Sequence, residues 1–238
     1  PTGHDAPLVH VHPDPDELGR VFTPKVAIAA TPDAFLLALG QVPAQPEWHA
    51  WRAAARAGYE AWQETPGVLD DIVRGMRDLL PEDAIVTNGA GNFTRPVQRA
   101  YSYRRPGRQL APISGAMGYG LPAAMAAALA HPERAVVCVA GDGDLLMTGQ
   151  ELATIAHHGL RVTVLVVDNG AYGTIRTHQE RRYPGRPIAT ALTNPDFVQL
   201  ARSYGMSAER TSGVDDTLAA LRRALGAGTA ALVHLVSE

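Results

Sequence analysis

The sequence predicts an α/β protein built on a three-layer parallel sheet, preceded by the tail of a second α/β domain. Residues 135–140 and 161–167 are short, β-branched and almost entirely apolar, which is typical of strands buried on both faces of a parallel sheet. Thr148 and Glu151 form a capping-box pattern, so a helix is predicted from 149 to near Gly159. Strand, helix and strand make one right-handed βαβ unit, around which the chain is organised.

Polar turns follow both predicted strands. Gly141, Asp142 and Gly143 come after the first, and residues 168–170 (Asp-Asn-Gly) after the second. Carboxyl ends of parallel strands meet at one edge, where open α/β sheets bind ligands. The Asp142 carboxylate and the Asn169 carbonyl suit Mg²⁺, and glycines let backbone N–H groups approach phosphate oxygens. Either triplet alone is more often an ordinary turn, but both at this spacing favour a cation and diphosphate site.

Composition limits the classes of function. The 238 residues are 46% hydrophobic, and 21 basic against 24 acidic residues give a net charge of −3, so bulk electrostatics favours no nucleic-acid or membrane partner. Cys138 lies in an apolar strand, where a buried inert thiol is expected. No apolar run could span a bilayer and no signal sequence opens the chain, which favours a cytoplasmic setting. The first residue is Pro1, so we expect a fragment or a processed chain.

Three segments are predicted. Residues 1–40 contain two short strands and a helix with Thr31 as its N-cap and Gly40 as its terminator. Residues 41–64 are a linker and packing helix with three tryptophans, and without a basic stripe interdomain packing is favoured over a nucleotide platform. Residues 65–238 are the main domain.

Within the main domain, further elements follow from local patterns. Residues 67–80 form a helix that ends at Pro81, and 84–88 form the domain's first strand. Toward the end of the chain, a helix capped by Asn194, another helix and a closing strand complete a regular scaffold without evident chemistry.

The two turns, with the helix and apolar strand between them, resemble the diphosphate motif of thiamine-diphosphate-dependent enzymes, and most closely the acetolactate synthase-like 2-oxo acid decarboxylases and carboligases. The resemblance implies the thiamine diphosphate-binding fold, and Mg²⁺ held by the side chains of Asp142 and Asn169 and the backbone carbonyl of Ala171. It also implies a set of cofactor-binding residues: Asn92, Phe93, Gly115, Ala116, Met117, Gly141, Asp142, Gly143, Asp144, Asn169, Ala171, Tyr172 and Gly173.

Several of these residues have individual roles in the family. Asn92 is implied to touch the diphosphate, whereas Phe93 stands where histidine is often found and can offer only its backbone. The Gly115 carbonyl is implied to accept from the 4′-amino group of the cofactor. Met117 is implied to wedge beneath the cofactor rings, and the alternative is ordinary core packing. The glycines of 115–120 do not follow the dinucleotide fingerprint, so an NAD site is not favoured.

Ile175 and His178 match substrate-pocket positions of acetolactate synthases. His178 replaces a tryptophan that is typical of the biosynthetic enzymes, which leaves the substrate open. It is either a proton-transfer group or a surface histidine.

The resemblance implies decarboxylation or carboligation of a 2-oxo acid, a transferase or lyase activity. Alternatives are a benzoylformate or acyl-CoA type of decarboxylase, or a non-catalytic cofactor-binding fragment. It also implies an N-terminal pyrimidine-binding domain with a glutamate from a neighbouring subunit, in a homodimer or homotetramer. No segment here matches that domain, so we expect the chain to be inactive alone. FAD is possible in the family, but nothing in this chain supports it.

Overall fold

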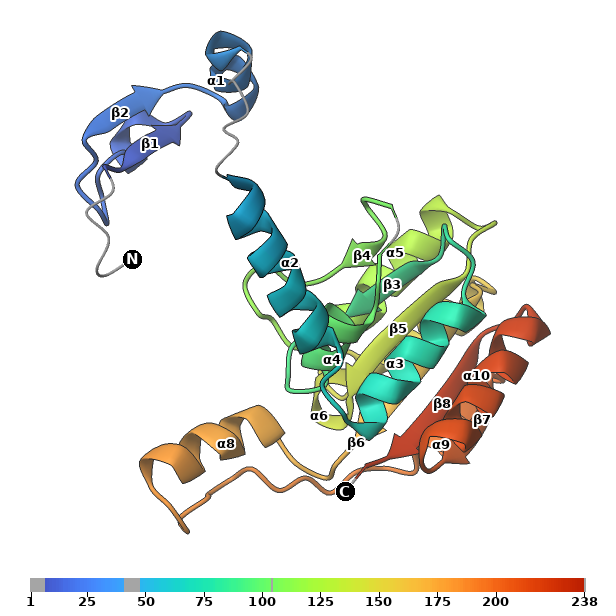
Figure 1. The fold of residues 1–238 in the computed structure, drawn as a ribbon. Helices are drawn as coiled ribbons and strands as arrows, with labels where there is room; N and C mark the ends of the chain where they lie inside the picture. Colours follow the sequence, from blue (N-terminus) through green and yellow to red (C-terminus); the bar gives the residue numbers. More distant parts are fainter. Residues whose placement is uncertain (1–6, 41–47, 104, 238) are drawn as a thin grey trace. The chain divides into compact units, whose positions relative to one another are not determined.

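The computed structural model describes residues 7–40, 48–103 and 105–237. The chain divides into two compact units, Pro1–Arg56 and Ala57–Glu238 (Figure 1). Helix α2 (Trp48–Gln63) crosses this division, and residues 41–47 of the predicted linker lie outside the described part. No helix in that part is long and apolar enough to cross a membrane.

The first unit contains the strands and the helix that the sequence predicts. Strands β1 (Val9–His12) and β2 (Val26–Ala29) pair in parallel, with a 3₁₀ turn (Pro15–Glu17) between them. Helix α1 (Pro32–Leu39) begins after Thr31, whose hydroxyl accepts from the Ala34 N–H at 3.3 Å, and ends at Gly40 with φ +62°. That this unit is the end of a larger domain stays a prediction.

The second unit is a six-stranded parallel sheet, which confirms the predicted fold class. The strand order is β4-β3-β5-β6-β8-β7. The bounds are β3 (Ile85–Asn88), β4 (Gln109–Leu110), β5 (Val136–Gly141), β6 (Val162–Asp168), β7 (Ser207–Thr211) and β8 (Ala231–Val236). All neighbours are parallel, so the strands end at a common edge. The short strands β4 and β7 were not predicted individually.

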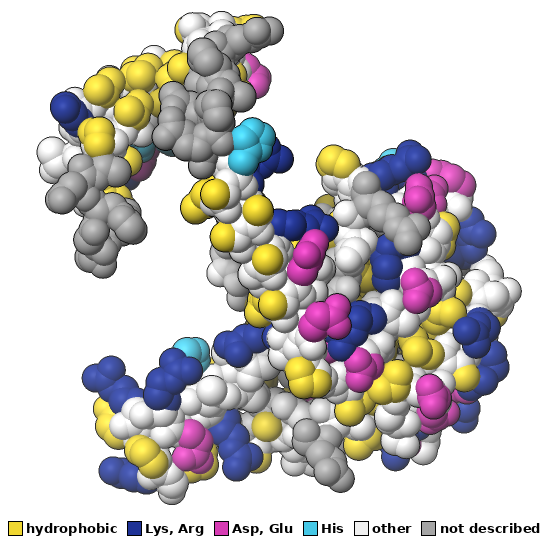
Figure 2. Space-filling view, viewed as in Figure 1, with side chains coloured by type: hydrophobic (Ala, Val, Ile, Leu, Met, Phe, Trp, Pro, Cys, Tyr) yellow, Lys and Arg dark blue, Asp and Glu magenta, His cyan; other side chains and the backbone are white. Residues whose placement is uncertain are grey.

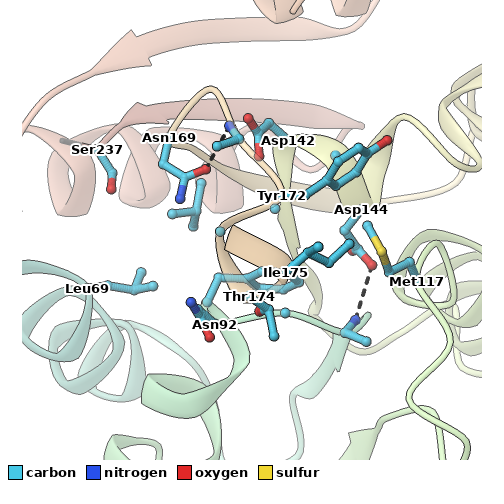
Figure 3. Close-up of a pocket in the computed structure, with 18 residues that line it drawn as sticks. Leu69, Asn92, Met117, Asp142, Asp144, Asn169, Tyr172, Thr174, Ile175 and Ser237 are labelled. Carbon is cyan, nitrogen blue, oxygen red and sulfur yellow. Dashed lines mark hydrogen bonds between the residues drawn. The ribbon is translucent and has the colours of Figure 1, made fainter. Parts of the chain in front are cut away.

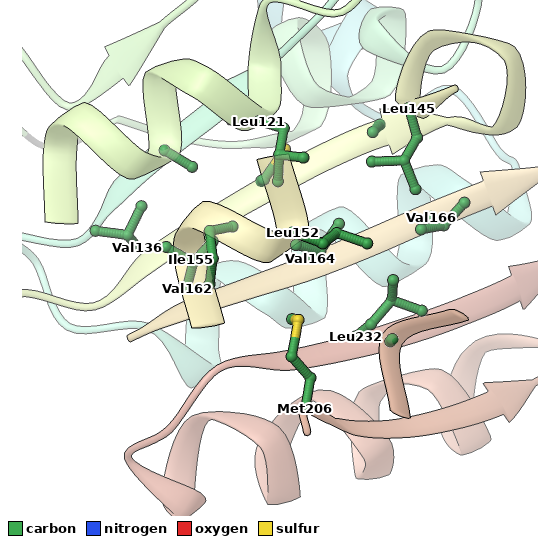
Figure 4. Packing of buried hydrophobic residues seen from close by; sticks show 14 of the residues in the cluster. Leu121, Val136, Leu145, Leu152, Ile155, Val162, Val164, Val166, Met206 and Leu232 are labelled. Carbon is green, nitrogen blue, oxygen red and sulfur yellow. The ribbon is translucent and has the colours of Figure 1, made fainter. Parts of the chain in front are cut away.

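Helices cover both faces of this sheet, which gives three layers. One face carries α5 (Gly120–Ala130), α7 (Leu152–His157) and α9 (Phe197–Ser203), and the other α3 (Val68–Leu79), α4 (Thr94–Ala100) and α10 (Val214–Ala227). Within β5, Val136 and Cys138 face the first group of helices, and Val137 and Val139 face the second. Figure 4 shows the first of these cores, where Leu121 of α5 and Leu152 and Ile155 of α7 pack on β5 and β6.

The buried thiol of Cys138 agrees with an inert role. The residue is fully buried, and burial raises its pKa to about 12, so the nucleophilic thiolate is suppressed.

Two predicted helix caps are wrong because tertiary partners take the side chains. The Thr148 hydroxyl donates to the Gly118 carbonyl at 2.8 Å and caps no helix. The segment after it is a 3₁₀ turn (Gly149–Glu151) followed by α7. Likewise Asp196, and not Asn194, caps α9 by accepting from the N–H groups of residues 198 and 199.

A glycine at the start of α5 permits the close approach of that helix to β3. A Cβ on Gly120 would lie 2.8 Å from the Gly89 nitrogen and 3.0 Å from the Asn88 carbonyl carbon, both backbone atoms. We expect Gly120→Ala to lower the free energy of unfolding by about 1–3 kcal/mol through overpacking. Gly226 lies in α10 with nothing within 4 Å of its Cβ position, so Gly226→Ala should raise stability by about 0.5–1 kcal/mol. Urea unfolding compares the two variants, and a loss of stability in both would contradict this account.

Candidate functional site

A cavity of about 230 Å³ lies at the carboxyl ends of β3, β5 and β6 (Figure 3). It brings together most of the residues that the sequence singled out, namely Asn92, Phe93, Met117, Gly141, Asp142, Gly143, Asp144, Asn169, Ala171, Tyr172, Gly173 and Ile175. Gly115, Ala116 and His178 do not line it. The other lining residues were not predicted individually; they are Leu69, Ala90, Gly91, Val167, Thr174 and Ser237.

Strand register sets the two polar turns beside each other. Gly141 pairs with Val167 across β5 and β6, so Asp142 and Asp168 follow at neighbouring strand ends. Asp142 is 3% exposed, and burial raises the pKa of its carboxyl, although a hydrogen bond from Asn194 opposes the rise. A buried carboxylate with this shift gains from a nearby cation.

The second turn places two further oxygens at the cavity. Asn169 Oδ1 accepts from the Ala171 N–H at 3.1 Å, one of the dashed contacts in Figure 3. The Ala171 carbonyl accepts from the Gly173 N–H at 2.8 Å, and Gly170 has φ +64°. Asn169 and Ala171 therefore line the same cavity as Asp142.

The oxygen atoms at this edge of the sheet suit a cation that takes phosphate oxygens as its remaining ligands. Within residues 7–40, 48–103 and 105–237, no group of three or more His, Cys, Asp and Glu side chains could hold a metal ion. A cation here would instead use one carboxylate, an amide oxygen and a backbone carbonyl. Mg²⁺ accepts such a set because it usually keeps water or substrate phosphate oxygens as further ligands.

Asp144 joins three loops around the cavity. Its Oδ1 accepts from the N–H groups of Ala90 at 3.1 Å and Gly118 at 2.8 Å, and the residue is 3% exposed. Burial raises its pKa, although both backbone hydrogen bonds favour the charged form. The Asp144 carboxylate thus forms hydrogen bonds to other parts of the protein. Its contact with a cofactor stays a prediction.

The Phe93 ring forms one wall of the cavity against two glycines. A Cβ on Gly91 would lie 2.8 Å from Phe93 Cε1, and one on Gly141 would lie 2.8 Å from Phe93 Cδ1. Both separations are too short for a real side chain. Gly141 of the first turn therefore leaves the space that this ring occupies.

Tyr172 and Met117 line other parts of the cavity (Figure 3). A Cβ on Gly143 would lie 2.5 Å from Tyr172 Cε1, so the tyrosine ring covers the first turn. Met117 is half-buried and precedes Gly118, which has φ +81°.

Helix α8 (Gly173–Arg182) extends from the cavity and buries none of its residues. Ile175 in its first turn lines the cavity, whereas His178 lies one turn further on and is exposed. The side chain of Gln179 holds the returning segment through both backbone groups of Ile188, at 2.9 and 3.1 Å. Figure 2 shows dark blue basic side chains along this helix and its loop; they are those of Arg176, Arg181, Arg182 and Arg186.

Asp168, Asn194 and His234 form a network that the sequence analysis missed. Asn194 Nδ2 donates to Asp142 Oδ2 at 2.8 Å and to Asp168 Oδ1 at 2.7 Å, and His234 Nε2 lies 2.8 Å from Asp168 Oδ2. Burial pushes the pKa of Asp168 upward, but hydrogen bonds from His234 and the Gly170 N–H outweigh it and lower the pKa. One feature of the sequence could have indicated this network: His234 is the only polar residue in the apolar run 231–236, and a buried polar side chain needs a hydrogen-bond partner.

The fold and the site define a three-layer parallel α/β domain with a polar cavity at its strand ends. Comparisons with known proteins agree. The family described as "Thiamine pyrophosphate enzyme, C-terminal TPP binding domain" matches residues 89–235. The chain is 31% identical over 235 residues to the acetolactate synthase isozyme 2 large subunit of Escherichia coli (strain K12), covering 97% of this chain and 43% of that protein.

Two further relatives carry similar names. The isozyme 1 large subunit of the same organism is 33% identical over 241 residues, covering 97% of this chain and 42% of that protein. The acetolactate synthase large subunit of Parasynechococcus marenigrum is 35% identical over 213 residues, covering 84% and 34%. The chain thus spans about two fifths or less of these curated relatives. It belongs to the thiamine pyrophosphate-dependent enzyme family, among its acetolactate synthase-like members.

The Asp144 hydrogen bonds lead to a stability prediction. Asp144→Ala leaves the N–H groups of Ala90 and Gly118 without their acceptor, and each unsatisfied buried donor costs about 1–3 kcal/mol. We expect the free energy of unfolding in urea to fall by at least about 2 kcal/mol. Asp71→Ala is the control, because Asp71 pairs with Arg74 in a largely exposed i,i+3 ion pair worth at most about 1 kcal/mol. Equal losses in the two variants would contradict the loop-joining role.

Proposed function

We propose that this chain supplies the diphosphate and metal half of a thiamine-diphosphate- and Mg²⁺-dependent enzyme that decarboxylates or ligates a 2-oxo acid. One observation carries the proposal. Asp142, Asn169 and Ala171, which come from two separate turns, line a single cavity. Membership of the thiamine pyrophosphate-dependent family supports it.

Each group of residues has a proposed task at this cavity. The Asp142 carboxylate, the Asn169 amide oxygen and the Ala171 carbonyl would hold Mg²⁺. Gly141 and Gly143 would let the backbone approach the diphosphate, and Met117 would support the rings. When bound, thiamine diphosphate supplies the carbon that attacks a carbonyl and the electron sink that follows.

The other half of the site would come from another domain. Asn169 and Ile175 are exposed where they line the cavity, so a second surface could close over it and exclude water. We propose that a pyrimidine-binding domain with a glutamate fills this place from a neighbouring subunit, in a homodimer or homotetramer with a cytoplasmic setting. The chain aligns with only 43% and 42% of two longer relatives. This supports a site that is divided between two domains.

The metal assignment leads to a binding prediction. Asp142→Ala removes the carboxylate proposed to bind the cation, so Mg²⁺-dependent retention of thiamine diphosphate should be lost. Calorimetric titration of the full chain with thiamine diphosphate, with and without Mg²⁺, measures this effect. Glu151→Ala is the matched control, since Glu151 lies in the next turn, outside the cavity, and accepts from Thr154. Unchanged Mg²⁺ dependence in Asp142→Ala would contradict the assignment.

Activity provides the test of the whole proposal. The chain alone, with thiamine diphosphate and Mg²⁺, should consume neither pyruvate nor benzoylformate, because half of the cofactor cleft would be open to water. Addition of the proposed pyrimidine-binding domain should restore turnover. Turnover of pyruvate supports the acetolactate synthase-like reading, and turnover of benzoylformate alone supports the decarboxylase alternative. Equal turnover with and without the added domain would refute the shared site, and none in either case would favour a non-catalytic fragment.

A further inference from the structure

Asn194 lies outside both sequence motifs yet links them. Its side-chain nitrogen donates to Asp142 Oδ2 at 2.8 Å and to Asp168 Oδ1 at 2.7 Å. One carboxylate opens the first polar turn and the other ends β6, immediately before Asn169. The Asn194 amide therefore links the two turns that face the cavity.

The chemistry of the partners determines which end of the amide faces them. Carboxylates only accept hydrogen bonds, so the atom between them is the nitrogen, whose two hydrogens serve one acceptor each. The other end of Asn194, Oδ1, is buried and has no hydrogen-bond partner among the described residues. Leaving a buried acceptor unpaired is unfavourable, which indicates that the contacts to the carboxylates control this side chain.

The backbone presents Asn194 at a defined place. Two residues earlier, the Leu192 N–H donates to the Gly170 carbonyl at 2.8 Å, which ties the segment to the second turn. Pro195 restricts the backbone of the residue before it to extended conformations, and Asp196 then caps α9. Asn194 is therefore held on both sides without help from its own side chain.

Asp168 is anchored from the far side by His234. His234 Nε2 lies 2.8 Å from Asp168 Oδ2, the residue is 3% exposed, and its ring packs edge-to-face on Phe197 with 5.2 Å between centroids. Because Asp168 also belongs to β6, it is a fixed point. Asn194 is hydrogen-bonded to this fixed carboxylate and therefore holds Asp142 relative to it.

We propose that Asn194 is a positioning residue for the cation: by holding Asp142 Oδ2, it would fix the orientation of the carboxylate that is proposed to bind Mg²⁺. This inference rests on the proposed function. Mg²⁺ demands nearly ideal octahedral geometry, so a carboxylate free to rotate binds it less well. Loss of a hydrogen-bond partner of a metal ligand typically weakens metal affinity about 10–100-fold.

The test is the Mg²⁺ concentration that gives half-maximal retention of thiamine diphosphate by the full chain. Asn194→Ala should raise this concentration about 10–100-fold, and saturating Mg²⁺ should restore full retention, because the ligand itself is still present. Asp196→Ala is the matched control. It removes the cap of α9 two residues away and should lower the urea midpoint, but it should leave the Mg²⁺ requirement unchanged.

Three outcomes separate this inference from the proposed function. A wild-type Mg²⁺ requirement in Asn194→Ala, beside loss of Mg²⁺ dependence in Asp142→Ala, overturns the positioning role alone. An equal rise of the Mg²⁺ requirement in Asn194→Ala and Asp196→Ala also overturns it, since a general loss of stability would explain both. Retained Mg²⁺ dependence in Asp142→Ala overturns the proposed metal site and this inference with it. If Asn194→Ala does not fold, Asn194→Ser serves instead, because one hydroxyl hydrogen cannot serve two carboxylates.

Discussion

The cavity depends on a buried carboxylate that accepts two backbone hydrogen bonds. Asp144 follows the first polar turn, and its oxygen receives the N–H groups of Ala90 and Gly118 from two other loops. A charge buried in this way is costly unless it is hydrogen-bonded, so the three loops are stable mainly in the arrangement that pairs it. Parallel strands bring the loops to one edge of the sheet, and the hydrogen bonds to Asp144 hold the loops together there.

Sequence patterns predicted the sheet and the location of the cavity because both depend on local, repeating features. Continuous apolar runs identified β5 and β6, and parallel pairing then required their polar turns to be neighbours. Twelve of the residues singled out line the cavity. His178 does not, because a helix that begins at the cavity carries its second turn away from it.

Side chains with several possible partners could not be assigned from sequence. Thr148 has a capping pattern, yet its hydroxyl donates to Gly118 in a different loop. Asn194 is a good N-cap residue by type, yet two carboxylates more than 25 residues away bind its amide. Charged acceptors form the stronger hydrogen bonds, which explains why tertiary contacts prevailed over local preference at Asn194. At Thr148 the competing acceptor is a neutral backbone carbonyl from another loop, whose position local sequence does not reveal.

The packing of Phe93 against Gly91 and Gly141 limits how this cavity can change in evolution. A side chain at either glycine would clash with the ring in its present position, so the three positions are coupled. A smaller polar residue at 93 would open space beside both glycines and could also bring a hydrogen-bond donor to the first turn. A single substitution at 93 would then alter the volume and the polarity of the cavity together. A substitution at either glycine would require the ring at 93 to move or to be replaced.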